Sequence, residues 1–457
     1  MSAPAARSTL AAPPLPAGAP GIAAPGSVME RAARSPGAPA PDPAAAPRRP
    51  AVPGAAARAA PDRAAPDRAA PDRVADLSHR VLWSMPRRDQ RRSGELYVRG
   101  LLRATGRKTI RNIASHTGVP ADIQRLHHLV TASTWRWSPV RGALAHHMGE
   151  LLNPVAWVLH TATTPRAGPG GVGVDAHCAD PRTGRPVNAR RSVGLWAATE
   201  WGGYPVDWHL GLSARWAEDA VLRERAGIPE DVRVLDAAAA GVDLAMASAR
   251  TAGPPCRPVV LDARTAEAGP LAARLGAGGV PYLLRISASQ LLTPLAPDGP
   301  ERGPVVTARQ LAGAVPPRRW SRVCAWGPGA GPREVARVAC RAAGVPSRSR
   351  QGQTLLVQRD PRGPADGGYW LTDLGHLSDG ALLRLAAAPA RLARDMGVTG
   401  RQVGLYDFEG RTFAGWHRHM TLASVAHATV VLLRARRRSE PRPRAAEGAG
   451  TRPRRQP

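Results

Sequence analysis

The first regular pattern of hydrophobic and polar positions along the chain is helical. Between residues 82 and 113, apolar residues recur at the spacing of one face of an amphipathic helix. These residues are Leu82, Met85, Leu96, Val98, Leu101, Leu102, Ile110 and Ile113. Further helices are expected over residues 122–132 and 139–152. Residues 76–153 are therefore predicted to form a small all-helical domain.

From residue 155 onward the pattern changes to short apolar runs that are typical of strands. These runs cover residues 156–159, 192–197, 206–212, 258–261 and 281–286. A helical segment at 265–275 separates the last two, and the order strand, helix, strand implies a partly parallel sheet. We therefore predict a mixed α/β domain over residues 154–433.

Proline and glycine interrupt residues 300–372, which are predicted to form a β-rich insertion in the α/β domain. Helical patterns return at 380–396 and 415–434. Residues 1–75 have almost no large apolar side chains, so burial cannot offset the entropy of ordering them. We expect this segment and the basic tail 434–457 to be disordered, although the first could also act as a basic arm on DNA phosphates.

The chain holds 63 Lys and Arg against 35 Asp and Glu, which gives a net charge of +28. Such an excess indicates a polyanionic partner, most often nucleic acid. Lys108 is the single lysine, so nearly all of the basic residues are arginine, which GC-rich codons encode. The placement of the arginines is therefore more informative than their number.

The cysteines give no sign of a zinc site or a disulfide framework, because they are scattered without a CxxC pair. They are Cys178, Cys256, Cys324 and Cys340. A signal peptide has a charged segment followed by an apolar one, and the first residues of this sequence do not show that pattern. The apolar stretch near 423–433 is too short to cross a bilayer. We expect a soluble, cytoplasmic protein without a membrane partner.

Several collinear motifs carry a resemblance to a known family. They are RRDQRRSGELYVRGLL at 87–102, GRKTI at 106–110, STW at 133–135, PVAW at 154–157, PVDWHL at 205–210, AGIP at 226–229, GLYDFEGR at 404–411 and GWHRH at 415–419. In their order and spacing they resemble actinobacterial insertion-sequence transposases of the DDE type. The resemblance covers roughly residues 77–433.

The resemblance implies an RNase H-like catalytic core with a β insertion, preceded by a helical DNA-binding region. It also implies cut-and-paste chemistry, in which three carboxylates hold two divalent metal ions. The ions would be Mg²⁺ or Mn²⁺, which prefer hard oxygen ligands. The partner would be double-stranded DNA at the inverted repeats of an insertion sequence, bound by a possible homodimer.

Two of the three acids that the family requires are replaced in this chain. By the resemblance, His160 stands at the first acid and Ala393 at the third, while Asp262 keeps the second. The lysine expected seven residues after the third acid is Gly400. Pro389 falls inside the helix of the third acid, where a proline costs about 3 kcal/mol. Asp262 alone would be a weak metal ligand, so we expect impaired catalysis.

Another alignment leaves an active enzyme open. The run 171–175 resembles a strand that ends in an acid, so Asp175, Asp262 and Glu409 could form a displaced triad. Against it, residues 184–195 match the family segment that should follow the first acid. Glu409 also belongs to the Glu-Gly-Arg motif downstream of the catalytic glutamate.

A cluster of basic residues near the N-terminal motif could follow a phosphate backbone. The candidates for DNA contact are Arg87, Arg88, Arg91, Arg92, Arg107 and Lys108, with Arg99, Arg103 and Arg111 close in sequence. The simpler interpretation is a solvated helix face. A third hypothesis is a regulatory, protein-binding role in which the charge reflects base composition only. Salt dependence separates it from specific DNA binding.

Overall fold

The structure is a computed structural model, and it describes residues 70–168, 170–179, 183–250, 256–296, 303–324, 331–343, 352–361 and 368–439. Helices dominate its N-terminal part. They are α1 (Ala70–Leu82), α2 (Arg88–Arg103), α3 (Ile110–Ser115), α4 (Asp122–Thr131) and α5 (Trp137–Leu152). The tails were predicted over residues 1–75 and 434–457, and residues 1–69 and 440–457 of them lie outside the described residues. The described part of each predicted tail is helical: α1 begins at Ala70, and the C-terminal helix ends at Ser439.

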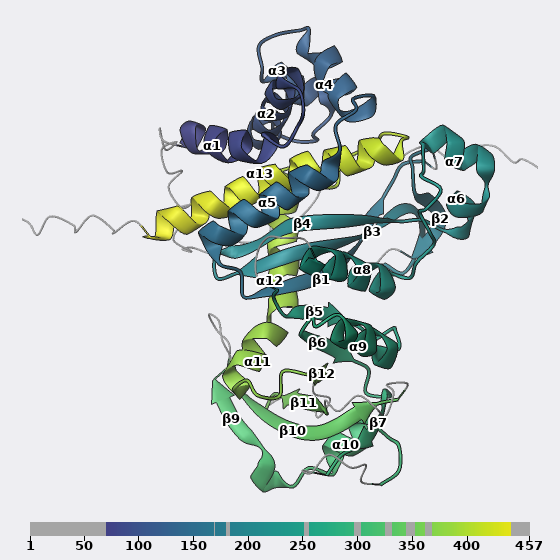
Figure 1. Ribbon diagram of the computed structural model, residues 1–457, viewed down its shortest axis with the longest axis vertical. Coiled ribbons are helices and arrows are strands. Elements are labelled where there is room, and N and C mark those ends of the chain that lie inside the picture. The colour runs from purple at the N-terminus through teal and green to yellow at the C-terminus, as the bar shows by residue number, and fades with distance from the viewer. Residues whose placement is uncertain are drawn as a thin grey trace, which may run out of the picture. The chain divides into compact units, whose positions relative to one another are not determined.

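Helices α1, α2, α4 and α5 pack on the C-terminal helix α13 (Phe413–Ser439), and α3 packs on α2 and α4. Figure 1 shows α13 in yellow beneath α1 to α4 and beside α5. From Gly415 to Thr429 every residue of α13 is buried, so this helix is covered on all sides. The buried residues of α2 include Tyr97, Val98 and Leu101, whose spacing places them on one face. The helical block and the sheet therefore share α13 as a common core element.

The sheet combines antiparallel and parallel strands. Its first strands are β1 (Ala156–Pro165), β2 (Val174–Ala179), β3 (Pro186–Thr199), β4 (Gly202–Gly211), β5 (Val259–Asp262) and β6 (Tyr282–Ile286). Strand β3 pairs antiparallel with β1, β2 and β4, whereas β1, β5 and β6 run parallel. The connections between them include α6 (Ala214–Glu218), α7 (Ala220–Ala226), α8 (Ala237–Arg250) and α9 (Ala268–Ala277). The predicted mixed α/β architecture is confirmed.

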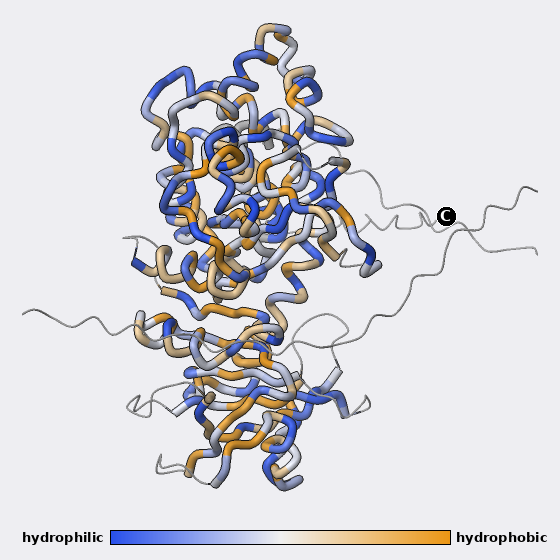
Figure 2. Tube along the Cα trace, turned by 90° about the vertical axis from the view of Figure 1, so that its right-hand side faces the viewer, coloured by the Kyte–Doolittle hydropathy of each residue, from blue (hydrophilic) through white to orange (hydrophobic). Residues whose placement is uncertain are grey.

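A second group of strands continues the sheet beyond β6. These strands are β7 (Leu291–Pro294), β8 (Val306–Thr307), β9 (Ser321–Cys324), β10 (Pro332–Ala342), β11 (Gln353–Arg359) and β12 (Gly368–Thr372). Strand β12 pairs antiparallel with β6, and the order continues through β11, β10, β7 and β8. Two short helices, α10 (Ala308–Gly313) and a 3₁₀ turn (Pro317–Arg319), lie among them. Figure 2 shows these lower strands as mostly hydrophobic, and more hydrophilic stretches in the helical block above.

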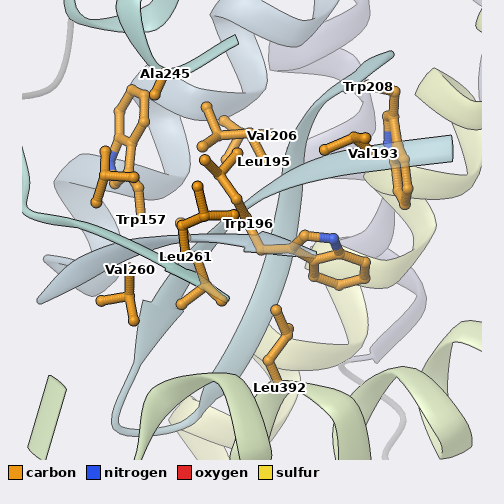
Figure 3. Packing of buried hydrophobic residues seen from close by; sticks show 14 of the residues in the cluster. Trp157, Val193, Leu195, Trp196, Val206, Trp208, Ala245, Val260, Leu261 and Leu392 are labelled. Carbon is orange, nitrogen blue, oxygen red and sulfur yellow. The ribbon is translucent and has the colours of Figure 1, made fainter. Parts of the chain in front are cut away.

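Both faces of the first strands are covered. On one face, α8 comes so close that a Cβ on Gly241 would lie 3.0 Å from Leu159 Cδ1. On the other face, Trp196 packs edge-on against Trp208 at 5.6 Å between ring centroids. Figure 3 shows these tryptophans with Leu392 of α12 (Ala388–Asp395). Side chains alternate along β1, so its two faces meet different helices.

The C-terminal helical region before α13 is divided. It consists of α11 (Asp379–Ala386), α12 and a π-helical turn (Met396–Gly400). None of the helices in the described part of the chain is both long and apolar enough to cross a membrane.

Candidate active-site pocket and nucleic-acid interface

Strand β1 opens at its carboxyl end into a cavity of about 840 Å³. Residues 160–165 of β1 form one wall, and Ala393 of α12 forms part of another. His160 and Ala393, which sequence reasoning placed at two acid positions, therefore line the same cavity although they lie on distant segments. Asp407 is the one carboxylate among the residues that line this cavity.

Asp262 lies at the end of β5, one position beyond the register pair of Leu159 with Leu261. His160 and Asp262 thus occupy equivalent positions on neighbouring parallel strands. Asp262 lines an adjacent cavity of about 1010 Å³, which shares residues 161–163 with the cavity at His160. The structure brings the three predicted positions to one edge of the sheet.

The Asp262 carboxylate is held by Arg264 in a two-pronged contact. Arg264 Nε donates to Oδ1 at 2.9 Å, and Nη2 donates to Oδ2 at 2.7 Å. Partial burial raises the pKa of Asp262, but the hydrogen bonds and charge of Arg264 and the charge of Arg285 outweigh it and lower the pKa. Both carboxylate oxygens already accept hydrogen bonds from a cation, so a metal ion would have to compete with Arg264 for them.

His160 cannot take over the role of a carboxylate. Burial lowers the pKa of its imidazole, so the ring is neutral at neutral pH. A neutral imidazole brings no negative charge to a divalent ion that prefers oxygen ligands. Within the described residues, no group of three His, Cys, Asp or Glu side chains could hold a metal ion.

The helix of the third acid position differs from the prediction. The predicted helix 380–396 is divided at Ala387, and Pro389 falls in the first turn of α12. There the missing N–H has no intrahelical partner to lose, so the predicted cost for Pro389 is wrong. Gly400, at the predicted lysine position, ends the π-helical turn.

The displaced triad is not gathered in the structure. Asp175 accepts a hydrogen bond from Ser213 Oγ at 2.6 Å and has Arg191 3.8 Å away. Glu409 forms an ion pair with Arg107. Neither carboxylate lines a described cavity that contains Asp262.

Helix α2 presents a row of arginines to solvent. Arg88, Arg92, Arg99 and Arg103 are exposed and lie four, seven and four residues apart, which places them on one helix face. We call these four residues the α2 arginine face. The row is a surface to which a phosphate backbone could bind.

The other predicted arginines at this end of α2 have local partners. Arg87 Nη2 donates to Thr134 Oγ1 at 2.9 Å. The Arg91 guanidinium lies 4.3 Å from the ring centroid of Trp83, whose side chain is 63% exposed. These contacts hold Arg91 beside an exposed aromatic ring.

Lys108 does not belong to the exposed surface, contrary to the sequence interpretation. It is only 5% exposed, and its ammonium donates to the carbonyl of Ala104. Its stem packs against Gly404, which has φ 72° and leaves no room for a Cβ. Its backbone N–H donates to Asp407 at 2.8 Å, and burial lowers the pKa of the side chain. Lys108 fastens the loop after α2 to the Gly404 turn instead of facing DNA.

Two arginines that line the cavity were not among the predicted site residues. Arg166 and Arg401 both line the cavity at His160. Arg166 lies six residues after His160, an even offset along the direction of β1, and this alternation could have placed the two side chains on one face. Arg401 could not be found this way, because it reaches the cavity from a segment over 200 residues away.

Residues 80–350, more than half of the chain, match the family described as DDE superfamily endonuclease. Among solved structures, the chain is similar to the cryo-EM structure of the piggyBac transposase synaptic complex with hairpin DNA. The TM-score is 0.37 and the identity 10%, over 82% of this chain and 74% of that one. No curated protein matches the chain.

Proposed function

Since the chain belongs to the DDE superfamily endonucleases, we propose that it is a transposase-like DNA-binding protein whose cut-and-paste chemistry is impaired. We further propose that the described sheet is the DDE-type, RNase H-like core of this family; the family implies a divalent metal when the enzyme is active. The finer statement, that this copy binds DNA and does not cut it, is our proposal.

The observation that carries the proposal is the cavity at the end of β1. Cut-and-paste chemistry requires carboxylates that hold two metal ions at the reacting phosphate. His160 and Ala393 line this cavity, and neither supplies an anionic oxygen. Asp262 is engaged by Arg264. Of the three acid positions that the chemistry needs, one therefore carries a carboxylate, Asp262, and that carboxylate is paired with Arg264.

The α2 arginine face supports retained DNA binding. Four exposed guanidinium groups on one helix face can contact successive phosphates, and Trp83 with Arg91 extends this surface with an aromatic ring. We propose insertion-sequence inverted repeats in double-stranded DNA as the ligand, bound by a possible homodimer. In this arrangement the protein occupies the ends of the element without cleaving them.

An active enzyme is the second candidate. It would require Asp175, Asp262 and Glu409 to converge on one metal pair, which means releasing Asp175 from Ser213, Asp262 from Arg264 and Glu409 from Arg107. Each release costs a hydrogen bond or an ion pair. We favour the impaired form because it leaves the contacts of these three carboxylates as they are in the structure.

The binding part of the proposal is tested by competition at physiological salt. A labelled duplex carrying the inverted repeat that flanks the gene is bound to the full chain, and unlabelled inverted repeat or random duplex is added. The proposal expects the inverted repeat to compete at least about tenfold better. If both duplexes compete equally and binding is lost as salt rises, the protein binds DNA through its charge alone, without sequence specificity.

A further inference from the structure

The cavity at the end of β1 is lined by more positive than negative groups. Arg107, Arg166 and Arg401 line it, and Asp407 is the single acidic residue among its lining residues. Asp407 is itself engaged by the backbone N–H of Lys108. A cavity with this charge balance repels metal cations and attracts anions.

Arg166 is the most enclosed of the three arginines. Its Nη2 donates to the carbonyl of Tyr406 at 2.8 Å. Its Nε is buried and has no hydrogen-bond partner among the described residues. Burial lowers the pKa of Arg166 and outweighs the charge of Glu409, which raises it; the charge of Arg107 lowers it further, and that of Asp407 raises it. A buried cationic donor without an acceptor is costly, and an anion would remove that cost.

A further guanidinium group lies behind Arg166. Arg190 Nη1 donates to the carbonyl of Phe408 at 2.9 Å, whereas its Nη2 is buried and has no partner in the described structure. Burial and the nearby charge of Arg166 lower the pKa of Arg190 to about 9. Arg166 and Arg190 are therefore neighbouring cations, and each has one buried N–H group without a hydrogen-bond partner in the described structure.

We propose that this cavity binds a phosphate group of a nucleic-acid backbone without a metal ion, through Arg166 and Arg401, with Arg107 at its rim. The identity of the ligand as nucleic acid rests on the proposed function, whereas the anion site rests on the cavity alone. Planar guanidinium groups match the paired oxygens of a phosphate. A volume of about 840 Å³ also admits the sugar and base next to that phosphate.

The two replaced acid positions change the electrostatics of the cavity. Acids at positions 160 and 393 would offset the positive charge of the lining arginines, whereas His160 and Ala393 add no negative charge, and only Arg107 among these arginines has an ion pair with a carboxylate, Glu409, in the described structure. His160 is neutral at pH 7.5 because burial lowers its pKa, so it neither adds to nor opposes anion binding there. The same two substitutions that remove metal ligands thus create a site for phosphate.

The test uses inorganic pyrophosphate as the probe, titrated calorimetrically into the full chain at pH 7.5 with EDTA present. We expect saturable binding at one site. Arg401→Gln, at an exposed lining residue, should weaken it roughly tenfold or more, by the loss of a charge-assisted hydrogen bond. Arg225→Gln, on the exposed surface of α7 away from the cavity, removes the same charge and should leave the affinity unchanged.

A second pair of variants keeps the test independent of folding defects. His160→Asp places a carboxylate in the cavity wall and should weaken pyrophosphate binding roughly tenfold or more. His160→Asn is neutral and should preserve it. Absence of saturable binding, or equal losses in Arg401→Gln and Arg225→Gln, would overturn the anion site. Duplex binding by the unmodified chain is measured separately, so its failure beside intact pyrophosphate binding would overturn only the proposed function.

Discussion

Arginines are exposed to solvent in one region of this molecule and buried in hydrogen bonds in another. On α2, Arg88 and Arg92 with their two companions point to solvent from one helix face. Around α13, Arg141 is only 4% exposed and donates to Asp207 at 2.6 Å and to Thr421 Oγ1 at 2.8 Å. Arg418 donates to the carbonyl of Val130 at 3.1 Å. The first region offers charge to a ligand, and the second uses its charge to join elements of the fold.

The contrast shows why a net charge of +28 does not by itself report on DNA binding. A guanidinium group whose donors are used on buried carbonyls adds to the total but cannot contact a phosphate. Arg141 connects α5, β4 and α13, and it also donates to the His417 carbonyl at 3.1 Å. The α2 arginine face and the cavity arginines keep guanidinium groups that a ligand could contact.

The largest effect is expected from removing a buried arginine. Arg141→Leu leaves Asp207 without its partner and disconnects α5 from α13, so it should lower the free energy of unfolding by about 3–5 kcal/mol. Urea denaturation followed by circular dichroism measures this. The exposed counterpart, Arg88→Leu, should change stability by no more than about 0.5 kcal/mol. A loss below about 1 kcal/mol for Arg141→Leu would remove the distinction between the two regions.

The next effect is on DNA affinity, and it concerns the exposed region. A variant with all four residues of the α2 arginine face changed to Gln should bind duplex DNA about a hundredfold more weakly at physiological salt. The slope of log affinity against log salt should fall by about 3.6, because each lost phosphate contact contributes about 0.9.

The matched control for the α2 variant removes four exposed arginines elsewhere. They are Arg225, Arg233, Arg318 and Arg319. This control has the same net charge as the α2 variant, so it should bind DNA nearly as well as the unmodified chain. If both variants lose affinity equally, total charge and not the α2 face determines binding.

A smaller effect, on the pH dependence of stability, is expected from a buried histidine. Burial lowers the pKa of His427 to about 3, and both of its ring nitrogens lack a partner among the described groups. The unfolded chain therefore binds a proton near pH 6.5 that the folded chain does not, so stability falls as pH drops below about 6.5. His427→Leu should reduce the stability loss between pH 7 and pH 5 by about 2 kcal/mol.

The control for this pH dependence is His128→Leu, at an exposed position of α4. It should leave the change of unfolding free energy with pH unaltered, as measured by urea denaturation at several pH values. The prediction fails if His427→Leu retains the full acid sensitivity of the unmodified chain. His419 has its pKa lowered by burial to about 4, so part of the acid sensitivity should remain in the variant.

Hydrophobic patterning was sufficient to predict the mixed α/β class, because buried strands and amphipathic helices leave local signals. It could not give the length of β1. The predicted strand 156–159 continues to Pro165 in the structure, since Thr161 and Thr163 pair with β3 although they are polar. A polar strand end at a cavity has the same pattern as a loop.

The site depended on contacts between distant segments, which a local pattern does not contain. Lys108 looked like a phosphate contact, yet its burial depends on Gly404 and Asp407, about 300 residues later. The contact of Arg264 with Asp262 spans only two residues and was open to prediction from the sequence. A guanidinium group two residues from a carboxylate competes with a metal ion for that carboxylate.

The most direct test of the account is a cleavage and strand-joining assay on DNA that carries the inverted repeats flanking the gene, with Mg²⁺ or Mn²⁺. The unmodified chain is compared with Asp262→Ala and Asp175→Ala, and duplex binding is measured in the same samples. The account predicts binding by the unmodified chain and no cleavage above the Asp262→Ala background. Metal-dependent cleavage that both substitutions abolish would contradict it and establish an active enzyme with displaced acids.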